Sequence, residues 1–125
     1  MLSESPLYVA IPVTDLREAR RFYEDVLGLT PVREGETEVL YLAGSTRVAI
    51  YPSQDAGSAQ HTLGSFIVED IESVSAGLRS RGVSFEEYDM PELKTVNGIA
   101  HLGPDKVAWF KAPSGNILSP VQEDV

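Results

Sequence analysis

The 125-residue sequence contains no cysteine, and this absence excludes several kinds of chemistry at once. Disulfide bonds, thiolate zinc sites and cysteine nucleophiles all require a residue that the chain does not have. Long hydrophobic runs are also missing, since no stretch approaches the roughly 20 apolar residues of a membrane-spanning helix. Met1 to Pro6 has neither the basic start nor the apolar run of a signal peptide. We therefore expect a cytoplasmic protein with no membrane partner.

Basic residues are scarce, with 10 Lys and Arg against 19 Asp and Glu, so the net charge is −9. Because such a chain is repelled by a phosphate backbone, we expect no nucleic-acid partner. The acidic surface would tolerate a cationic ligand. The chain is long enough for one domain with a hydrophobic core.

The N-terminal part has the pattern of a strand followed by a capped helix. Apolar residues alternate along Leu7–Val13, which predicts a strand with one branched apolar face. Asp15 and Glu18 have the spacing of a capping box, which predicts that a helix begins here. Residues 16–27 carry one apolar stripe at helical spacing, and Gly28 is placed to end the helix.

A second copy of this pattern follows. The letters VTDL at 13–16 align with VEDI at 68–71, and Gly82 ends the second helix. Further strands are predicted at residues 29–34, 38–43, 46–51, 62–68, 83–88, 99–102, 106–112 and 117–122, with a long connection at 89–105. We predict a single α+β domain with module one at about 5–52, a linker at about 53–60 and module two at about 61–123. The two tandem βαβββ modules would form a curved, cup-like mixed sheet with the helices on its outer face.

Two motifs are similar to a known family. VTDLREARRFYEDVLGL at 13–29 and WFKAPSGNIL at 109–118 resemble the vicinal oxygen chelate superfamily. That superfamily includes glyoxalase I, extradiol dioxygenases, epimerases, fosfomycin-resistance transferases and bleomycin-resistance proteins. The resemblance covers nearly the whole chain and implies the fold rather than one activity. The closing turn departs slightly, because the usual Asp-Pro-Asp-Gly-Asn is Ala-Pro-Ser-Gly-Asn at residues 112–116.

The resemblance also implies where a metal would bind. Metal-using members place one ligand, usually His or Glu, on each of four strands. The corresponding positions here are Tyr8, Ala49, Leu63 and Ser119. Because none of them supplies a nitrogen or anionic oxygen donor, we predict no metal and no cofactor. His61 and His101 would be the alternative metal ligands. Without a metal, His61 is expected to be a solvent-facing residue at a strand entrance, and His101 a residue of a loop or edge strand.

The sheet face that would point away from the helices carries rings, small groups and hydroxyls. We predict that a small-molecule ligand is bound by Tyr8, Ala49, Tyr51, Leu63, Ser65, Trp109 and Ser119, with His101 and Lys94 from the long connection. Trp109 has the same parity as Ser119 and should lie beside it. Tyr88, Asp89 and Glu92, in or beside the same connection, would add polar contacts. Such a lining suits an apolar or aromatic ligand, including a cationic one. The alternative is that the rings fill a dimer interface or plug the cup.

Three functions fit these observations. The first is a metal-independent small-molecule binding protein of the glyoxalase/bleomycin-resistance type. The second is a lyase, isomerase or dioxygenase of the same superfamily, either metal-dependent or using Tyr8, His101 or Asp89 in acid–base chemistry. The third is a non-catalytic regulatory or interaction module. No catalytic residue is assigned. We also expect a homodimer, because open half-barrels leave strand edges and apolar surface that a second copy can cover.

Overall fold

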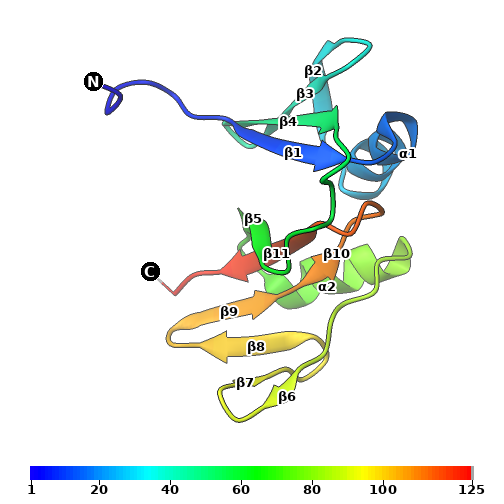
Figure 1. Ribbon diagram of the computed structural model, residues 1–125. Helices are drawn as coiled ribbons and strands as arrows, with labels where there is room; N and C mark the ends of the chain where they lie inside the picture. Colours follow the sequence, from blue (N-terminus) through cyan, green and yellow to red (C-terminus); the bar gives the residue numbers. More distant parts are fainter. Residues whose placement is uncertain (125) are drawn as a thin grey trace. The chain divides into compact units, whose positions relative to one another are not determined.

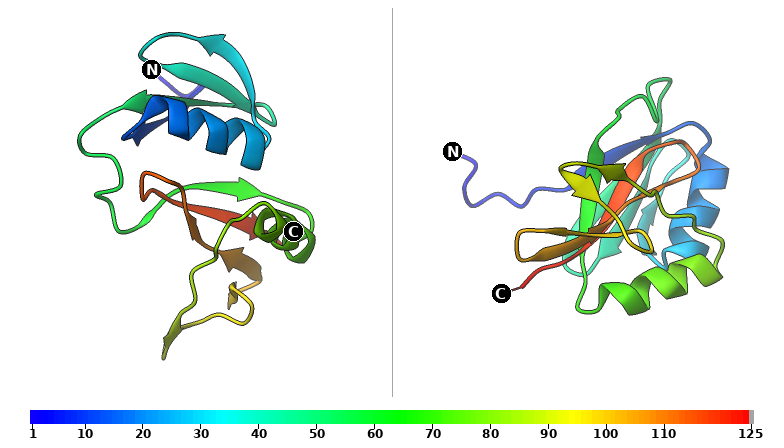
Figure 2. Two further views of the ribbon diagram at one scale, coloured as in Figure 1. Left: turned by 90° about the vertical axis from the view of Figure 1, so that its right-hand side faces the viewer. Right: turned by 90° about the horizontal axis from the view of Figure 1, so that it is seen from below.

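The computed structural model describes residues 1–124, and the chain forms two compact units, Met1–Gly57 and Ser58–Val125. Both units are α+β, with one helical segment packed on one face of a mixed sheet (Figures 1 and 2). The α+β class expected from the sequence is therefore confirmed. Within the described residues, none of the helices is long and apolar enough to cross a membrane.

The first unit is a βαβββ module. In chain order it contains β1 (Val9–Val13), α1 (Leu16–Arg21), the π-helical turn η1 (Phe22–Val26), β2 (Thr30–Glu34), β3 (Val39–Ala43) and β4 (Thr46–Pro52). The sheet order is β1-β4-β3-β2, in which β1 runs parallel to β4 and the other pairs are antiparallel. The helical segment thus connects an edge strand of this sheet to the opposite edge.

The first helix begins where the sequence predicts and ends differently. Asp15 caps it, since its carboxylate accepts a hydrogen bond from the Glu18 backbone N–H at 3.1 Å. After Arg21 the helix widens into a π-turn, in which the Leu27 N–H donates to the Phe22 carbonyl at 3.0 Å. The expected continuous α-helix is therefore corrected to an α-helix with a π-helical end.

The register of the first sheet separates two faces. Ile11, Ile50 and Val39 pair across three strands, and all three are buried. Ala49 belongs to the next row, which faces the other way and pairs with Ala10 and Leu40. The apolar face predicted for β1 is therefore present, although the strand begins at Val9.

The second unit contains more and shorter elements. They are β5 (Thr62–Ile67), α2 (Ile71–Ser80), β6 (Asp89–Met90), β7 (Leu93–Lys94), β8 (Ile99–Leu102), β9 (Asp105–Ala108), β10 (Phe110–Lys111) and β11 (Ile117–Gln122). The five-stranded sheet has the order β10-β11-β9-β8, and β5 pairs in parallel with β11. β6 and β7 form a separate two-stranded antiparallel sheet.

The second helix is fixed at its start by two hydrogen bonds. The Asp70 carboxylate accepts from the Ser73 N–H at 3.2 Å, so the predicted cap is confirmed. The Gln122 side-chain oxygen accepts from the Ile71 N–H at 2.9 Å and joins the helix to the end of β11. Because helix N-terminal N–H groups have no partner within the helix, both bonds stabilise this end.

Three strands of the second unit differ from the sequence expectation. The strand expected at 83–88 is reduced to one bridge between Phe85 and Phe110. The strand expected at 106–112 is interrupted at Trp109, whose carbonyl accepts from the Glu86 N–H at 2.8 Å. On that side the partner changes from β8 to Phe85, whereas β11 pairs with both β9 and β10. In β5, Thr62 pairs with Ile117 whereas Gly64 pairs with Leu118, and this register shift interrupts the simple alternation expected for 62–68.

Candidate ligand site in the second unit

Trp109 lies opposite Ser119 in the second sheet. Phe110 pairs with Leu118, and Val107 pairs with Val121, so one register runs through both β9 and β10. The same offset places Trp109, between these strands, across from Ser119. The neighbourhood expected from the parity of the two residues is thus present in the structure.

The indole of Trp109 is held by a neighbouring strand. Its Nε1–H donates to the Thr62 hydroxyl at 3.1 Å. Because of the register shift in β5, Thr62 shares a row with Ile117, which lies on the same face as Ser119. The sequence analysis placed Leu63 on this face beside Ser119 and missed Thr62, because a strictly alternating pattern gives no sign of a β-bulge.

Tyr88 completes an aromatic corner with Trp109. The two ring centroids are 5.5 Å apart, and the rings are nearly perpendicular at 85°. This edge-to-face arrangement is favourable between aromatic rings. We call Thr62, Tyr88, Trp109 and Ser119 the tryptophan site. It contains two rings and three hydroxyls, and such groups bind flat molecules by stacking and orient them by hydrogen bonds.

The backbone around Tyr88 is fixed by Thr95. The Tyr88 N–H donates to the Thr95 hydroxyl at 2.8 Å, and the Thr95 N–H donates to the Tyr88 carbonyl at 2.9 Å. The Thr95 hydroxyl in turn donates to the Glu87 carboxylate, which also accepts from the Gly98 N–H. The hydrogen bond from Thr95, followed by that from Gly98, lowers the pKa of Glu87. Hydrogen bonds within residues 87–98 therefore fix the backbone position of Tyr88.

Ser65 and Ser119 are partners in the parallel pair of β5 and β11. Ser119 is buried, and its hydroxyl lies 3.4 Å from the Pro120 carbonyl, whereas Ser65 is exposed. Leu63 is half-buried at the register shift. The structure thus brings three of the expected residues, Ser65, Trp109 and Ser119, to one face of the second sheet.

The expected residues of the first unit lie on or next to β1 and β4. Ala49 is fully buried in β4, and Tyr51, two residues further, is 37% exposed. Tyr8 directly precedes β1 and is 48% exposed. By parity all three belong to the face that carries Ala10, away from the buried row at Ile11.

His101 and Lys94 lie elsewhere in the second unit. His101 pairs with Lys106, and Lys106 pairs with Gln122, whose side chain binds the N-terminus of α2. This row therefore faces α2, whereas Ser119 faces the other way. Lys94 and His101 line one depression together with Arg79 of α2. The structure brings these two residues together and separates them from the tryptophan site.

The donor chemistry at the four family metal positions does not suit a divalent ion. Two are aliphatic, one is a phenol and one is the buried Ser119 hydroxyl, so none offers an imidazole or a carboxylate. Within residues 1–124, no three histidine or acidic side chains are grouped so that they could hold a metal ion. These residues therefore do not fit the metal that other members of the fold use.

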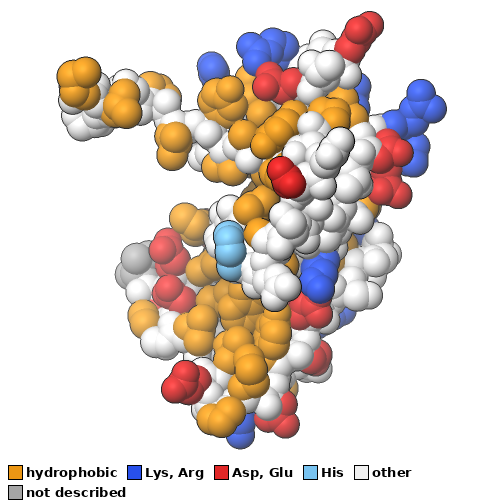
Figure 3. Space-filling model, viewed as in Figure 1, with side chains coloured by type: hydrophobic (Ala, Val, Ile, Leu, Met, Phe, Trp, Pro, Cys, Tyr) orange, Lys and Arg blue, Asp and Glu red, His pale blue; other side chains and the backbone are white. Residues whose placement is uncertain are grey.

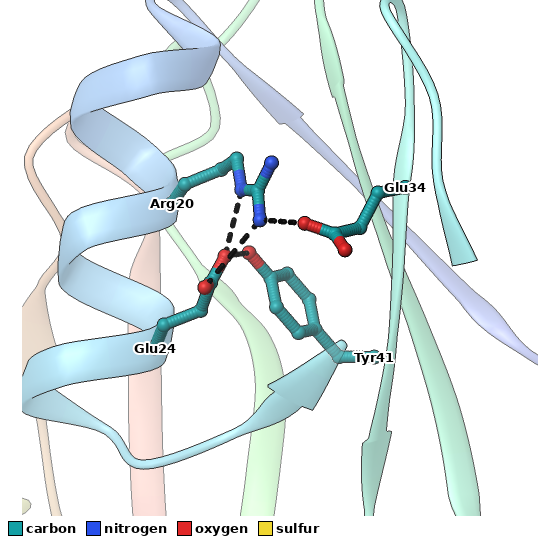
Figure 4. A network of polar contacts seen from close by, with 4 residues as sticks. All are labelled: Arg20, Glu24, Glu34 and Tyr41. Atoms are coloured by element: carbon teal, nitrogen blue, oxygen red, sulfur yellow. Dashed lines mark hydrogen bonds and ion pairs between the residues drawn. The ribbon is translucent and has the colours of Figure 1, made fainter. Parts of the chain in front are cut away.

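In the first unit, a polar network lies between the helical segment and the sheet (Figure 4). The Tyr41 hydroxyl donates to the Glu24 carboxylate at 2.7 Å, and Arg20 Nε donates to the same oxygen at 2.7 Å. Arg20 also pairs with Glu34 of β2. The network thus joins the helical segment to β2 and β3.

The pKa shifts in this network favour the charge states that hold it together. The hydrogen bond from Arg20 lowers the pKa of Glu24, and the bond from Tyr41 acts in the same direction. Burial raises the pKa of Tyr41, and acceptance by Glu24 adds to the rise. Glu24 therefore stays ionised and Tyr41 stays protonated near neutral pH, which suits a structural role better than proton transfer.

With the fold and these residues established, comparison with known proteins defines the class of protein. The model of the Glyoxalase/Bleomycin resistance protein/Dioxygenase superfamily matches residues 5–118. The chain therefore belongs to this superfamily, and the resemblance noted from the two motifs is confirmed. No curated protein sequence matches the chain.

Solved structures share the fold at low sequence identity. A glyoxalase family protein from Enterococcus faecalis is 23% identical, with a TM-score of 0.74 over 97% of this chain and 99% of the other. A glyoxalase/bleomycin resistance protein/dioxygenase from Alicyclobacillus acidocaldarius is 16% identical, with a TM-score of 0.69 over 98% and 93%. TnmS3, an antibiotic binding protein from Streptomyces sp. CB03234, is 18% identical, with a TM-score of 0.69 over 99% of both chains.

Proposed function

We propose that the protein is a cytoplasmic, metal-independent binding protein for a flat, apolar or aromatic small molecule, including cationic ones. The observation that carries the proposal is the edge-to-face pair of Tyr88 and Trp109, whose indole is oriented by Thr62. A ring inserted beside the indole would gain stacking and buried apolar area. The hydroxyl of the half-buried Thr62 would supply a polar contact that orients a ligand.

Two further observations support binding over catalysis. The four family metal positions hold no nitrogen or anionic oxygen donor. One structural neighbour, TnmS3, is an antibiotic binding protein, so this fold does serve ligand capture. The proposed ligand class therefore remains flat, apolar or aromatic small molecules rather than a specific antibiotic.

Trp109 is the only tryptophan in the chain, so its fluorescence reports on the site directly. We expect proflavine, a flat cation, and 2-naphthol, a neutral ring, to quench this emission saturably, with the affinity checked by calorimetry. Tyr88→Ala should weaken binding about tenfold through loss of the ring pair, whereas Tyr88→Phe should bind within about twofold of the parent.

The outcomes separate the parts of the proposal. Affinity that is unchanged by EDTA supports metal independence, whereas elemental analysis that finds one bound ion per chain would overturn it. If no compound in an aromatic panel alters the emission of Trp109 or the thermal midpoint, the binding function itself is wrong.

We also propose that two copies of the chain associate. Ile67, Val121, Val107 and Ala100 form one row across four strands on the face away from α2, in which Val107 and Ala100 are buried and Val121 is half-buried. Hydrophobic side chains gather over β8 and β9 in the second unit (Figure 3), and Ile67 is 73% exposed. A second copy would cover this surface. Sedimentation at micromolar concentration that finds only a 13.6 kDa species would contradict the dimer.

A further inference from the structure

The second unit has a depression on the α2 side of its sheet, opposite to the face of the tryptophan site. Its volume is about 490 Å³. The side chains that matter to its chemistry are Arg79 of α2, Lys94, Val96 and Asn97 from the connection, and Ile99 and His101 of β8. We propose that this depression is a second binding site, which takes a small organic molecule by its carboxylate or phosphate group.

Acidic residues outnumber Lys and Arg in this chain of net charge −9, and the depression brings two of the basic residues, Arg79 and Lys94, together. The side chains of Lys94 and His101 form no hydrogen bond or ion pair with any other residue in the described range 1–124. Both are therefore available to an incoming anion. Lys94 supplies three N–H donors and His101 at least one, which suits an oxyanion better than a neutral ligand.

The acidic groups around the depression are largely engaged. Glu72, which also lines the depression, pairs with Lys106 at 3.3 Å. Glu87 accepts from the Thr95 hydroxyl at 2.6 Å and from the Gly98 N–H at 2.7 Å. Asp89 is the register partner of Lys94 in the β6–β7 hairpin, and no ion pair joins the two within the described residues. The carboxylates thus leave the Lys94 ammonium free to bind an external anion.

Arg79 is held in place before any ligand arrives. Its guanidinium lies 4.9 Å from the centroid of the Phe85 ring, and one Nη atom donates to the Asn97 carbonyl. A guanidinium has five N–H donors, so this bond leaves donors for a carboxylate or phosphate. Because the planar group is already oriented, little conformational entropy is lost on binding.

The other walls indicate that the anion belongs to an organic molecule. Val96 is 76% exposed, and Ile99 is half-buried beside it in the lining. Apolar walls gain nothing from a bare inorganic ion, whereas they bury part of an aliphatic or aromatic body. The combination of cationic groups and apolar walls therefore selects an organic acid or a phosphomonoester.

A second groove with cationic groups lies on α1, and its chemistry is different. It has a volume of about 490 Å³ and is lined by Arg17, Arg20 and Arg21, but also by Glu24 and Asp25. Arg20 is already bound by two carboxylates, those of Glu24 and Glu34. Arg20 is therefore not available to an external anion, and the α1 groove serves as the comparison site in the test.

The test uses the full chain at low salt, with benzoate, phenyl phosphate and inorganic phosphate as probes. We expect saturable binding of at least one organic probe, with chemical-shift changes at Lys94, Asn97, Gly98 and His101 in a ¹H–¹⁵N spectrum. Lys94→Gln should weaken binding at least fivefold, and 0.3 M salt should weaken it as well. Arg47→Gln is the matched control, because it removes one exposed positive charge from the first unit.

Each outcome decides for or against the site. A preference for phenyl phosphate over benzoate identifies a phosphomonoester as the class, and the reverse preference identifies a carboxylate. Equal loss in Lys94→Gln and Arg47→Gln, shift changes confined to the α1 groove, or no saturable binding of any probe would overturn the proposal. Proflavine binding at the tryptophan site is measured in the same variants, so the two sites can fail independently.

Discussion

The two units share one plan, but the Tyr23–Tyr41 pair of the first unit and the Tyr88–Trp109 pair of the second lie on different sides of their sheets relative to the helix. In the first unit the rings of Tyr23 and Tyr41 stack at 6.2 Å, and Tyr41 donates to Glu24 of the helical segment. In the second unit Trp109 and Tyr88 pair on the face away from the helix. The same module thus has a polar network on the helix side in one copy and an aromatic pair on the opposite face in the other.

This difference suggests separate roles: the polar network of the first unit stabilises the fold, and the proposed sites of the second unit bind ligands. The Arg20–Glu24–Glu34–Tyr41 network ties three elements of the first unit together, and its members are partnered. The side chains of Lys94 and His101 in the second unit have no hydrogen-bond or ion-pair partner within residues 1–124. We therefore expect substitutions in the first unit to change unfolding, and substitutions in the second to change ligand binding as well.

The largest effect is expected from Gly98→Ala in the second unit. Gly98 has a φ of +78°, and an added Cβ would lie 2.9 Å from both an Arg79 Nη atom and the Phe85 Cβ. Left-handed backbone strain and overpacking together should lower the free energy of unfolding by about 3 kcal/mol. Displacement of Arg79 should also weaken phenyl phosphate binding. Urea unfolding and calorimetry measure the two effects.

Gly44→Ala in the first unit is the matched control. Gly44 also has a positive φ, +59°, but an added Cβ would have no neighbour within 4 Å. Only the backbone term remains, so the expected loss is about 1 kcal/mol with no change in phosphate binding. Equal losses in the two variants would mean that the close approach of Gly98 to Arg79 has no energetic role.

A smaller effect is expected from Glu24→Gln, and it should depend on pH. Because the pKa of Glu24 is lowered in the folded protein, its stabilising contribution is present above the unfolded value of 4.5 and is lost as pH falls below it. At pH 7 the variant should lose about 1–2 kcal/mol of unfolding free energy, since a charge-assisted bond to Arg20 is removed. Toward pH 3 the difference between variant and parent should shrink.

Glu36→Gln provides the control for this titration. Glu36 is exposed between β2 and β3 and has no bonded partner among the described residues, so its removal should alter stability little at either pH. A pH-independent loss in Glu24→Gln would contradict the electrostatic origin of the effect. It would assign the loss to packing of the helical segment instead.

Local signals predicted the elements well. Asp15 and Asp70 cap their helices as the sequence indicates, because a cap depends on residues within one turn. The final strand, Ile117–Gln122, also has the expected bounds. The π-turn after Arg21 was not predicted, because it is a change in the helix's own hydrogen bonding that side-chain periodicity does not reveal.

The candidate site was predictable only in part. Parity alone placed Trp109 beside Ser119, since one register runs through the whole β9–β10 stretch. Thr62 was missed because the register shift in β5 is set by its pairing with β11, which the sequence of β5 does not encode by itself. His101 and Lys94 were expected to share the aromatic site, but the pairing of β8 with β9 turns His101 toward α2.

The smallest effect, expected from Thr62→Val, tests whether the tryptophan site is oriented or merely apolar. Valine keeps the shape of threonine but removes the oxygen that accepts from the Trp109 Nε1–H at 3.1 Å. The half-buried indole should lose about 1 kcal/mol of hydrogen-bond stabilisation, and its emission should shift as the ring reorients. Thr46→Val in the first unit is the control, because Thr46 is exposed and its side chain has no partner among residues 1–124. Unchanged emission and unchanged proflavine affinity in Thr62→Val would mean that the pairing with Tyr88 alone positions the indole, and that Thr62 takes no part in recognition.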